Sequence, residues 1–136
     1  MRLFPVAMIL TYLATLIAFA GIDFIWLGYI AQGFYKSQIG HLYADNVNLP
    51  AAVAFYLVYV LGLVLFAVQP AAASGGVMKA LTLGATFGFF CYATYDLTNL
   101  ATLKNWTLQL SLTDMAWGAL LSGISAAIGA FAAGKF

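Results

Sequence analysis

Three aspartates are the residues of this chain whose type and position best suit chemistry inside a membrane. Asp23, Asp96 and Asp114 lie in or beside long apolar segments, whereas Asp45 lies in a polar stretch. A carboxylate at the centre of a bilayer costs about 2.5–3.5 kcal/mol on insertion scales. We therefore expect these three side chains to face the protein interior, either as a functional site or as a structural polar cluster. Asp114 has a further alternative as a helix N-cap.

Aromatic and polar residues accompany the aspartates at helical spacing. The pattern D-x-x-W occurs twice, as Asp23 with Trp26 and as Asp114 with Trp117, and residues three apart share one helix face. A further stripe of residues on one helix face, spaced i, i+3, i+4 and i+7, precedes the second motif. It consists of Tyr92, Tyr95, Asp96 and Asn99. The predicted ligand-binding set is Asp23, Trp26, His41, Tyr92, Tyr95, Asp96, Asn99, Lys104, Trp106, Asp114 and Trp117. Within it, Lys104 is a candidate counter-ion for one aspartate.

A carboxylate pocket lined by aromatic rings suits three kinds of chemistry. These are acid–base work on an apolar substrate, proton-coupled movement, and recognition of a cationic or hydroxylated ligand. The three membrane aspartates are the candidate catalytic groups, and whether the protein is an enzyme stays open. One histidine, one cysteine and no glutamate argue against a transition-metal site, and no glycine-rich phosphate loop occurs. We therefore predict no metal and no cofactor.

Four apolar segments must position these residues. Of 136 residues 65% are hydrophobic and 7% charged, whereas a soluble domain carries about 25% charged residues. A hydrocarbon core needs about 20 residues of helix, and the predicted spans cover residues 3–30, 51–68, 77–101 and 112–133, with Gln69-Pro70 ending the second. Residues 33–47 have apolar positions at helical spacing and predict a short amphipathic interfacial helix. A net charge of +1 gives no electrostatic case for nucleic acid.

These elements predict an all-α fold, a single transmembrane domain over residues 1–136 built as an antiparallel four-helix bundle. Because successive spans alternate in direction, all three aspartates lie in the same half of the bilayer. Arg2, Lys79 and Lys135 on one side against Lys36 and Lys104 on the other favour cytoplasmic termini, which places the aspartates in the outer half. Small residues recurring along the fourth span favour close helix packing within the bundle over self-association.

Three stretches of the chain resemble a known family. They are G-I-D-F-I-W-L-G at 21–28, Y-D-L-T-N-L-A-T-L-K-N-W at 95–106 and D-M-A-W-G at 114–118. Together they resemble domain-of-unknown-function family 2177, small four-span bacterial membrane proteins. The resemblance covers essentially the whole chain and implies a bacterial inner-membrane protein. The family has no established activity, so it implies no catalytic roles.

Three functions remain open at this level. The leading one is a pocket that binds or acts on an apolar or amphiphilic small molecule, such as a lipid or isoprenoid, which enters from the outer leaflet. The second is a proton-coupled small-molecule carrier, which requires an oligomer because one four-helix unit has few helices for alternating access. The third is a structural subunit or assembly factor of a larger membrane complex. The partners expected are accordingly membrane lipid, a small ligand, and either further copies of the chain or a membrane complex.

Overall fold

Long helices dominate the fold, which we describe from a computed structural model covering residues 4–136. Arg2 and the predicted start of the first span at residue 3 lie outside these residues. Every regular element described is helical. Four helices are long and apolar enough to cross a membrane, Val6–Ile30, Leu49–Ala73, Gly76–Thr102 and Leu108–Ala133. The predicted all-α fold with four membrane-spanning helices is confirmed.

The first half of the chain contains the first two spans. Helix α1 (Phe4–Ile25) continues into a π-helical turn, η1 (Trp26–Ile30). A short helix, α2 (Gln32–Ile39), and a 3₁₀ turn, η2 (Gly40–Leu42), follow within the segment predicted to be interfacial. The second span consists of α3 (Leu49–Leu63), a π-helical turn η3 (Val64–Val68) and α4 (Gln69–Ala73). The position of α2 at a membrane interface stays a prediction.

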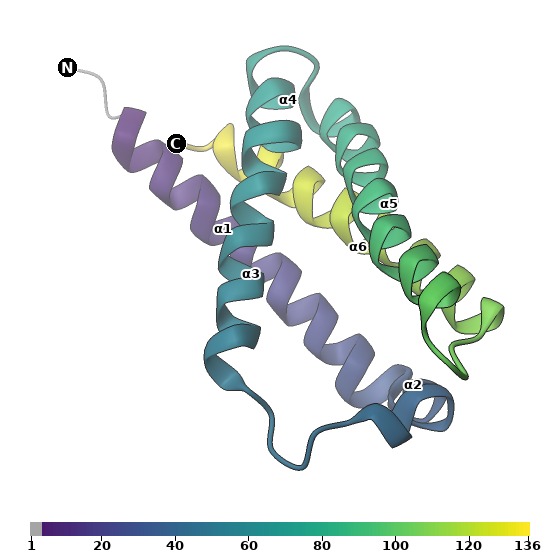
Figure 1. Cartoon of the computed structure of the whole chain (residues 1–136). Coiled ribbons are helices and arrows are strands. Elements are labelled where there is room, and N and C mark those ends of the chain that lie inside the picture. Colours follow the sequence, from purple (N-terminus) through teal and green to yellow (C-terminus); the bar gives the residue numbers. More distant parts are fainter. Residues whose placement is uncertain (1–3) are drawn as a thin grey trace.

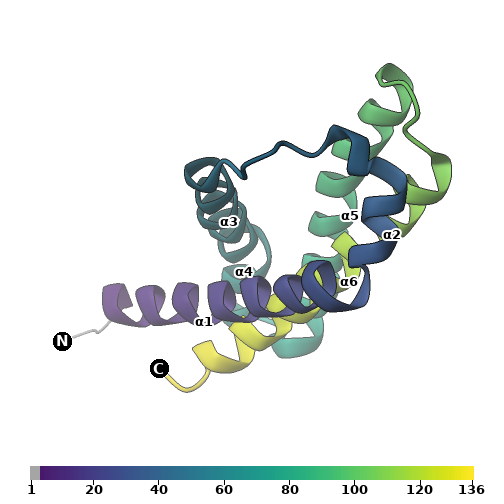
Figure 2. The same ribbon diagram turned by 90° about the horizontal axis from the view of Figure 1, so that it is seen from below.

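The second half is a pair of long antiparallel helices, α5 (Gly76–Thr102) and α6 (Leu108–Ala133). Helix α6 packs against both α5 and α1. Helix α1 crosses α3 obliquely, and the first turns of α1 lie near the end of α6 (Figure 1). Viewed along another direction, α3 and α5 stand on the same side of α1 (Figure 2).

The second span is longer than its sequence predicted, because Pro70 does not end it. Proline lacks an N–H and its ring presses on the carbonyl one turn earlier, which normally breaks a helix. Here the preceding turn is π-helical, and the Gln69 N–H donates to the Val64 carbonyl five residues back. A π-turn of this kind accommodates the proline ring and the missing N–H without ending the helix. The helix ends instead at Ala73, and Gly75 adopts a positive φ of 117° in the connection to α5.

The fourth span begins earlier than predicted, and this excludes one interpretation of Asp114. Thr107 is the N-cap of α6, with its hydroxyl accepting from the Leu110 N–H at 3.0 Å. Asp114 lies about two turns inside the helix and is buried, with 9% of its surface exposed. The N-cap interpretation is therefore wrong.

Small residues bring α6 close to its neighbours. A methyl group built on Gly84 of α5 would lie 2.6 Å from the Ser122 carbonyl oxygen of α6, and one on Gly88 would meet the Gly118 carbonyl. Further along α6, Gly129 packs on Thr15 of α1. The predicted role of these residues in packing within the bundle is confirmed.

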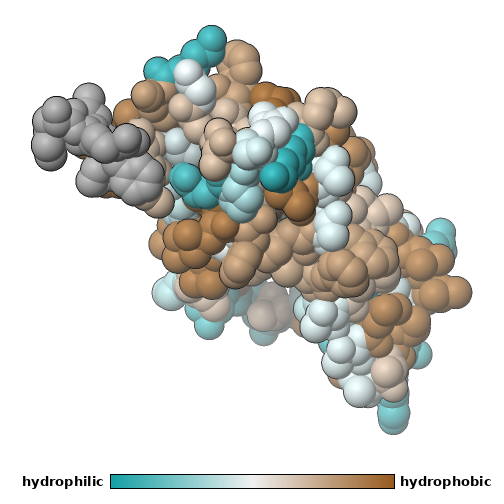
Figure 3. Space-filling view, turned by 90° about the horizontal axis from the view of Figure 1, so that it is seen from above, coloured by the Kyte–Doolittle hydropathy of each residue, from teal (hydrophilic) through white to brown (hydrophobic). Residues whose placement is uncertain are grey.

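The outer surfaces of the spans are apolar. Large side chains such as Ile17, Phe66 and Phe90 are each more than 60% exposed (70%, 65% and 63%). Hydrophobic residues cover most of one face of the molecule (Figure 3). A hydrocarbon solvent suits such a surface, as expected for a multi-pass membrane protein.

Candidate functional site

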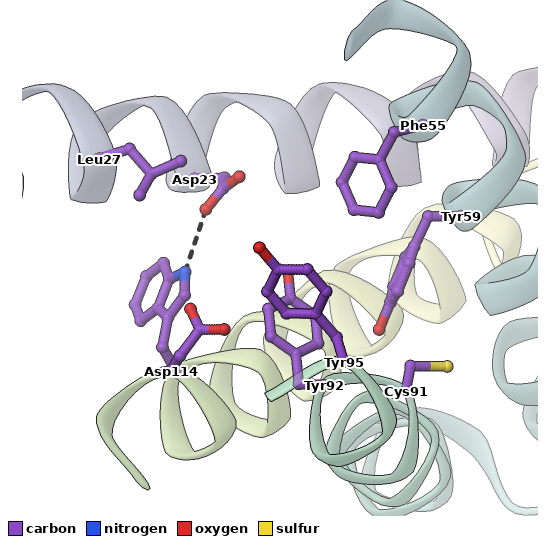
Figure 4. Close-up of a pocket in the computed structure, with 9 residues that line it drawn as sticks. Asp23, Leu27, Phe55, Tyr59, Cys91, Tyr92, Tyr95 and Asp114 are labelled. Atoms are coloured by element: carbon purple, nitrogen blue, oxygen red, sulfur yellow. Dashed lines mark hydrogen bonds between the residues drawn. The ribbon is translucent and has the colours of Figure 1, made fainter. Parts of the chain in front are cut away.

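The candidate site is a cavity of about 390 Å³ lined by side chains from the first span (α1 and η1), α3, α5 and α6. Figure 4 shows its lining side chains converging from these helices. Most of the wall is aromatic or aliphatic, and the polar groups gather where α1 approaches α6. The cavity is lined by Asp23, Leu27, Phe55, Tyr59, Cys91, Tyr92, Tyr95, Asp114 and Trp117.

Asp23 is held by donors from two other helices. Its side chain is only 5% exposed. Trp117 Nε1 of α6 donates to Oδ1 at 3.0 Å, and the Tyr56 hydroxyl of α3 donates to Oδ2 at 2.6 Å. Each carboxylate oxygen thus has one donor, and hydrogen bonds to a charged acceptor are stronger than neutral ones. Asp23 therefore ties α1 to both α3 and α6 at the cavity wall.

Asp114 is held from the segment that follows the first span. The Tyr35 hydroxyl of α2 donates to Asp114 Oδ1 at 2.7 Å, and the same hydroxyl accepts from Trp26 Nε1 at 3.2 Å. Burial raises the pKa of Tyr35 above its ordinary value, and the nearby Asp114 charge raises it further. Tyr35 therefore keeps its proton near neutral pH and acts as a donor to Asp114.

The tryptophan of each D-x-x-W motif is hydrogen-bonded, directly or through one residue, to the aspartate of the other motif. Trp117, in α6, binds Asp23 directly, while Trp26, the first residue of η1, reaches Asp114 through Tyr35. The two indole rings stack at 4.3 Å between centroids with an interplanar angle of 10°. The antiparallel packing of α1 and α6 makes this reciprocal arrangement possible, and the motifs form one unit rather than two.

Asp96 occupies a different environment from the other two aspartates. It has no exposed surface, and neither carboxylate oxygen has a hydrogen-bond partner within residues 4–136. It lines a second cavity of about 190 Å³, which Asp114 also lines. Asp114 therefore belongs to both cavities.

The remaining predicted residues are divided between these cavities and the surface. Tyr92 lines the first cavity, Tyr95 lines both, and Trp106 is buried in the second, where its Nε1 donates to Ser111 Oγ at 3.0 Å. Asn99 is half-buried one turn beyond Tyr95. His41 and Lys104 are exposed and line neither cavity. The hydrogen bonds of Asp23 and Asp114 come from tyrosine and tryptophan rather than from Lys104.

Sequence reasoning missed the contribution of the second span. Tyr56 binds Asp23, and Tyr59 lines the cavity with its hydroxyl 2.8 Å from Ser122 Oγ. These tyrosines lie three apart within an apolar helix, away from the interfacial position where tyrosine is commonest. That spacing was the available signal. Nor did the sequence indicate that Tyr35 is the donor to Asp114.

One family model covers almost the whole chain. It is described as "Predicted membrane protein (DUF2177)" and matches residues 8–131.

The chain belongs to the DUF2177 family. The resemblance drawn from the three sequence stretches is thereby confirmed, and all the cavity-lining residues lie inside the matched range. No curated protein and no solved structure matches the chain.

The chemistry available to this DUF2177 protein follows from the lining residues. They include two carboxylates and several tyrosine hydroxyls, and no lysine, arginine or histidine. No group of three or more histidine, cysteine, aspartate or glutamate side chains within residues 4–136 is placed to hold a metal ion. Such a wall repels an anionic head group, and it can accept hydrogen bonds from a hydroxyl or ammonium group.

Proposed function

We propose that this protein binds an apolar or amphiphilic small molecule, similar to a lipid or isoprenoid, in the aspartate and aromatic cavity. The observation that carries the proposal is the uneven distribution of polar groups in the 390 Å³ cavity. Carboxylates lie at one end, and the other walls are aromatic and aliphatic. Ligand pockets typically combine a mostly apolar lining with a few placed polar groups. The volume suits one chain or ring system rather than a whole two-chain phospholipid.

A path for such a ligand exists between α3 and α5. An open apolar groove of about 540 Å³ runs along these helices and shares Phe55, Tyr59 and Cys91 with the cavity. Gly62 and Phe87 also line it. A hydrocarbon chain lying in this groove would place its polar end beside Asp23 and Asp114, so entry from the bilayer requires no passage through water.

The polar end of the ligand is expected to carry a hydrogen-bond donor. Both oxygens of Asp23 already accept one bond each, but a carboxylate has about four lone-pair sites. A hydroxyl or ammonium head can use the remaining sites, and an ammonium gains further from the aromatic faces around it. A carboxylate or phosphate head finds no cation among the lining residues.

We also propose that the protein lies in the bacterial inner membrane with both termini in the cytoplasm. The resemblance to the family, which implies a bacterial inner-membrane protein, supports the location. The distribution of lysine and arginine supports the orientation. The cavity then opens in the outer half of the bilayer, and membrane lipid is its immediate partner.

Cys91 offers a direct test, because it is the only cysteine and lines both the cavity and the groove. The purified protein is treated with a membrane-permeant, thiol-reactive reagent that labels Cys91. A long-chain amine, alcohol or carboxylate of equal chain length is present during the labelling. We expect the amine and the alcohol to slow labelling at least several-fold and the carboxylate to have little effect.

The control compares the same substitution at two aspartates. Asp23→Asn should abolish protection by the amine, whereas Asp45→Asn, at an exposed position, should leave it unchanged. Equal protection by all three amphiphiles would mean that the head group is not recognised. No protection by any of them would overturn the pocket proposal.

A further inference from the structure

The buried carboxyl group of Asp96 has no conventional partner. Its side chain in α5 is 0% exposed, and both oxygens lack a donor within the described part of the chain, residues 4–136. Nearly all buried polar groups in proteins are hydrogen-bonded, so an orphaned carboxylate indicates a bound species that supplies the missing contact. An isolated buried charge is particularly unfavourable.

The groups facing Asp96 limit what that species can be. Tyr35 from α2, Tyr43 from the segment after η2, Tyr95 from α5 and Asp114 from α6 are the titratable residues around its cavity. None of the cavity-lining residues is cationic, and Lys104 is exposed on the α5–α6 connection. Asp96 therefore faces another carboxyl group in place of a counter-ion.

Two carboxyl groups hydrogen-bond to each other only when one of them carries a proton. Asp96 and Asp114 line the same cavity of about 190 Å³. The Tyr35 proton is already directed at Asp114 Oδ1, and no donor approaches either Asp96 oxygen within residues 4–136. We propose that Asp96 and Asp114 form a proton-binding site in which a single proton is shared between the two carboxyl groups.

The location of this site gives it a consequence. Asp114 lines both the smaller cavity with Asp96 and the larger cavity with Asp23. The shared proton sets the charge that Asp114 presents to the larger cavity. Proton binding at the pair is thus coupled electrostatically to whatever occupies that cavity. The proton site itself does not depend on the proposed ligand.

Infrared spectroscopy of the purified full-length protein tests the proposal. The carbonyl stretch of a protonated carboxyl group is resolved from that of a carboxylate and shifts in D₂O. The chain contains four aspartates and no glutamate, so such a band has few sources. At neutral pH the wild type should show one protonated carboxyl group per chain, and labelling with carboxyl-¹³C aspartate should shift the band.

Three variants assign the band. Asp96→Asn and Asp114→Asn should each abolish it, because an amide N–H replaces the shared proton as donor to the remaining carboxylate. Asp23→Asn should keep it, because Asp23 has donors of its own at both oxygens.

The absence of the band in the wild type would overturn the proposal even if no variant folded. Its persistence in both Asp96→Asn and Asp114→Asn would also overturn it. So would a wild type that lacks the band and gains thermal stability specifically with sodium, since the pair would then hold a metal cation.

Discussion

Removing the Tyr56 hydroxyl tests whether Asp23 joins α1, α3 and α6 as described. Tyr56→Phe deletes the donor to Asp23 Oδ2 at 2.6 Å and leaves the ring in place. Within residues 4–136 that oxygen keeps no other donor, while Trp117 still donates to Oδ1. The substitution therefore perturbs one hydrogen bond with little change in packing.

The expected loss in the free energy of unfolding follows from the charged acceptor, Asp23, and from the membrane surroundings of the hydrogen bond. Hydrogen bonds to charged groups contribute about 1.5–3 kcal/mol in soluble proteins, and interhelical bonds in membrane proteins average about 0.6 with a maximum near 1.7 kcal/mol. The short distance and charged acceptor place this bond near the upper membrane value, and the adjoining cavity lets the oxygen recover some solvation. We expect a loss of about 1.5 kcal/mol, roughly tenfold in the unfolding equilibrium.

The assay is reversible unfolding in mixed micelles, with Tyr12→Phe as the matched control. Tyr12 donates to a neutral acceptor, the Leu57 carbonyl, at 2.8 Å on the exposed side of the same pair of helices. Its loss should lower the free energy of unfolding by about 0.6 kcal/mol or less. In an Asp23→Leu background, Tyr56→Phe should cost nothing, because the hydroxyl has already lost its acceptor.

Two results would refute this reasoning. One is an equal effect of Tyr56→Phe and Tyr12→Phe on the free energy of unfolding. The other is an unchanged cost of Tyr56→Phe when Asp23 has been replaced by leucine.

Three further predictions concern packing, capping and ionisation. Gly84→Ala should destabilise the fold by about 1–3 kcal/mol, because its methyl group meets Ser122 of α6, whereas Gly28→Ala meets nothing within 4 Å and should not; thermal melting in detergent compares them. Thr107→Ala removes the N-cap of α6 and should lower the free energy of unfolding by about 1 kcal/mol. Amide hydrogen exchange should become faster only in the first turn of α6, and unchanged exchange in that turn would contradict the capping role. Because the pKa of Tyr35 is raised, its hydroxyl stays protonated to a higher pH than that of an ordinary tyrosine. A titration followed by tyrosinate absorbance should therefore be the same for Tyr35→Phe and the wild type below about pH 11. If the variant loses absorbance in that range, Tyr35 has an ordinary pKa and the reasoning is wrong.

The sequence alone determined the membrane-spanning character and the number of spans. Helix formation in hydrocarbon depends on the length and apolarity of each segment, which are local properties that need no knowledge of neighbours. Alternation of direction then places Asp23, Asp96 and Asp114 in the same half of the bilayer. The family match over residues 8–131 agrees with the motifs chosen by this reasoning.

Helix ends were predicted less well because they depend on particular backbone bonds. Pro70 was expected to stop the second span, yet the π-turn before it lets the helix continue to Ala73. The start of α6 at Leu108 follows from the Thr107 cap, a local signal that the polar appearance of the connection concealed.

The pairing of side chains across helices was decided only by the tertiary structure. The repeated D-x-x-W pattern predicted two motifs on two helix faces but could not show that Trp117 serves Asp23 while Trp26 serves Asp114 through Tyr35. Such partners depend on how each helix is rotated about its axis. That rotation follows from the close contact of small residues on α6 with α5 and α1, a property of the surfaces together and of no single segment.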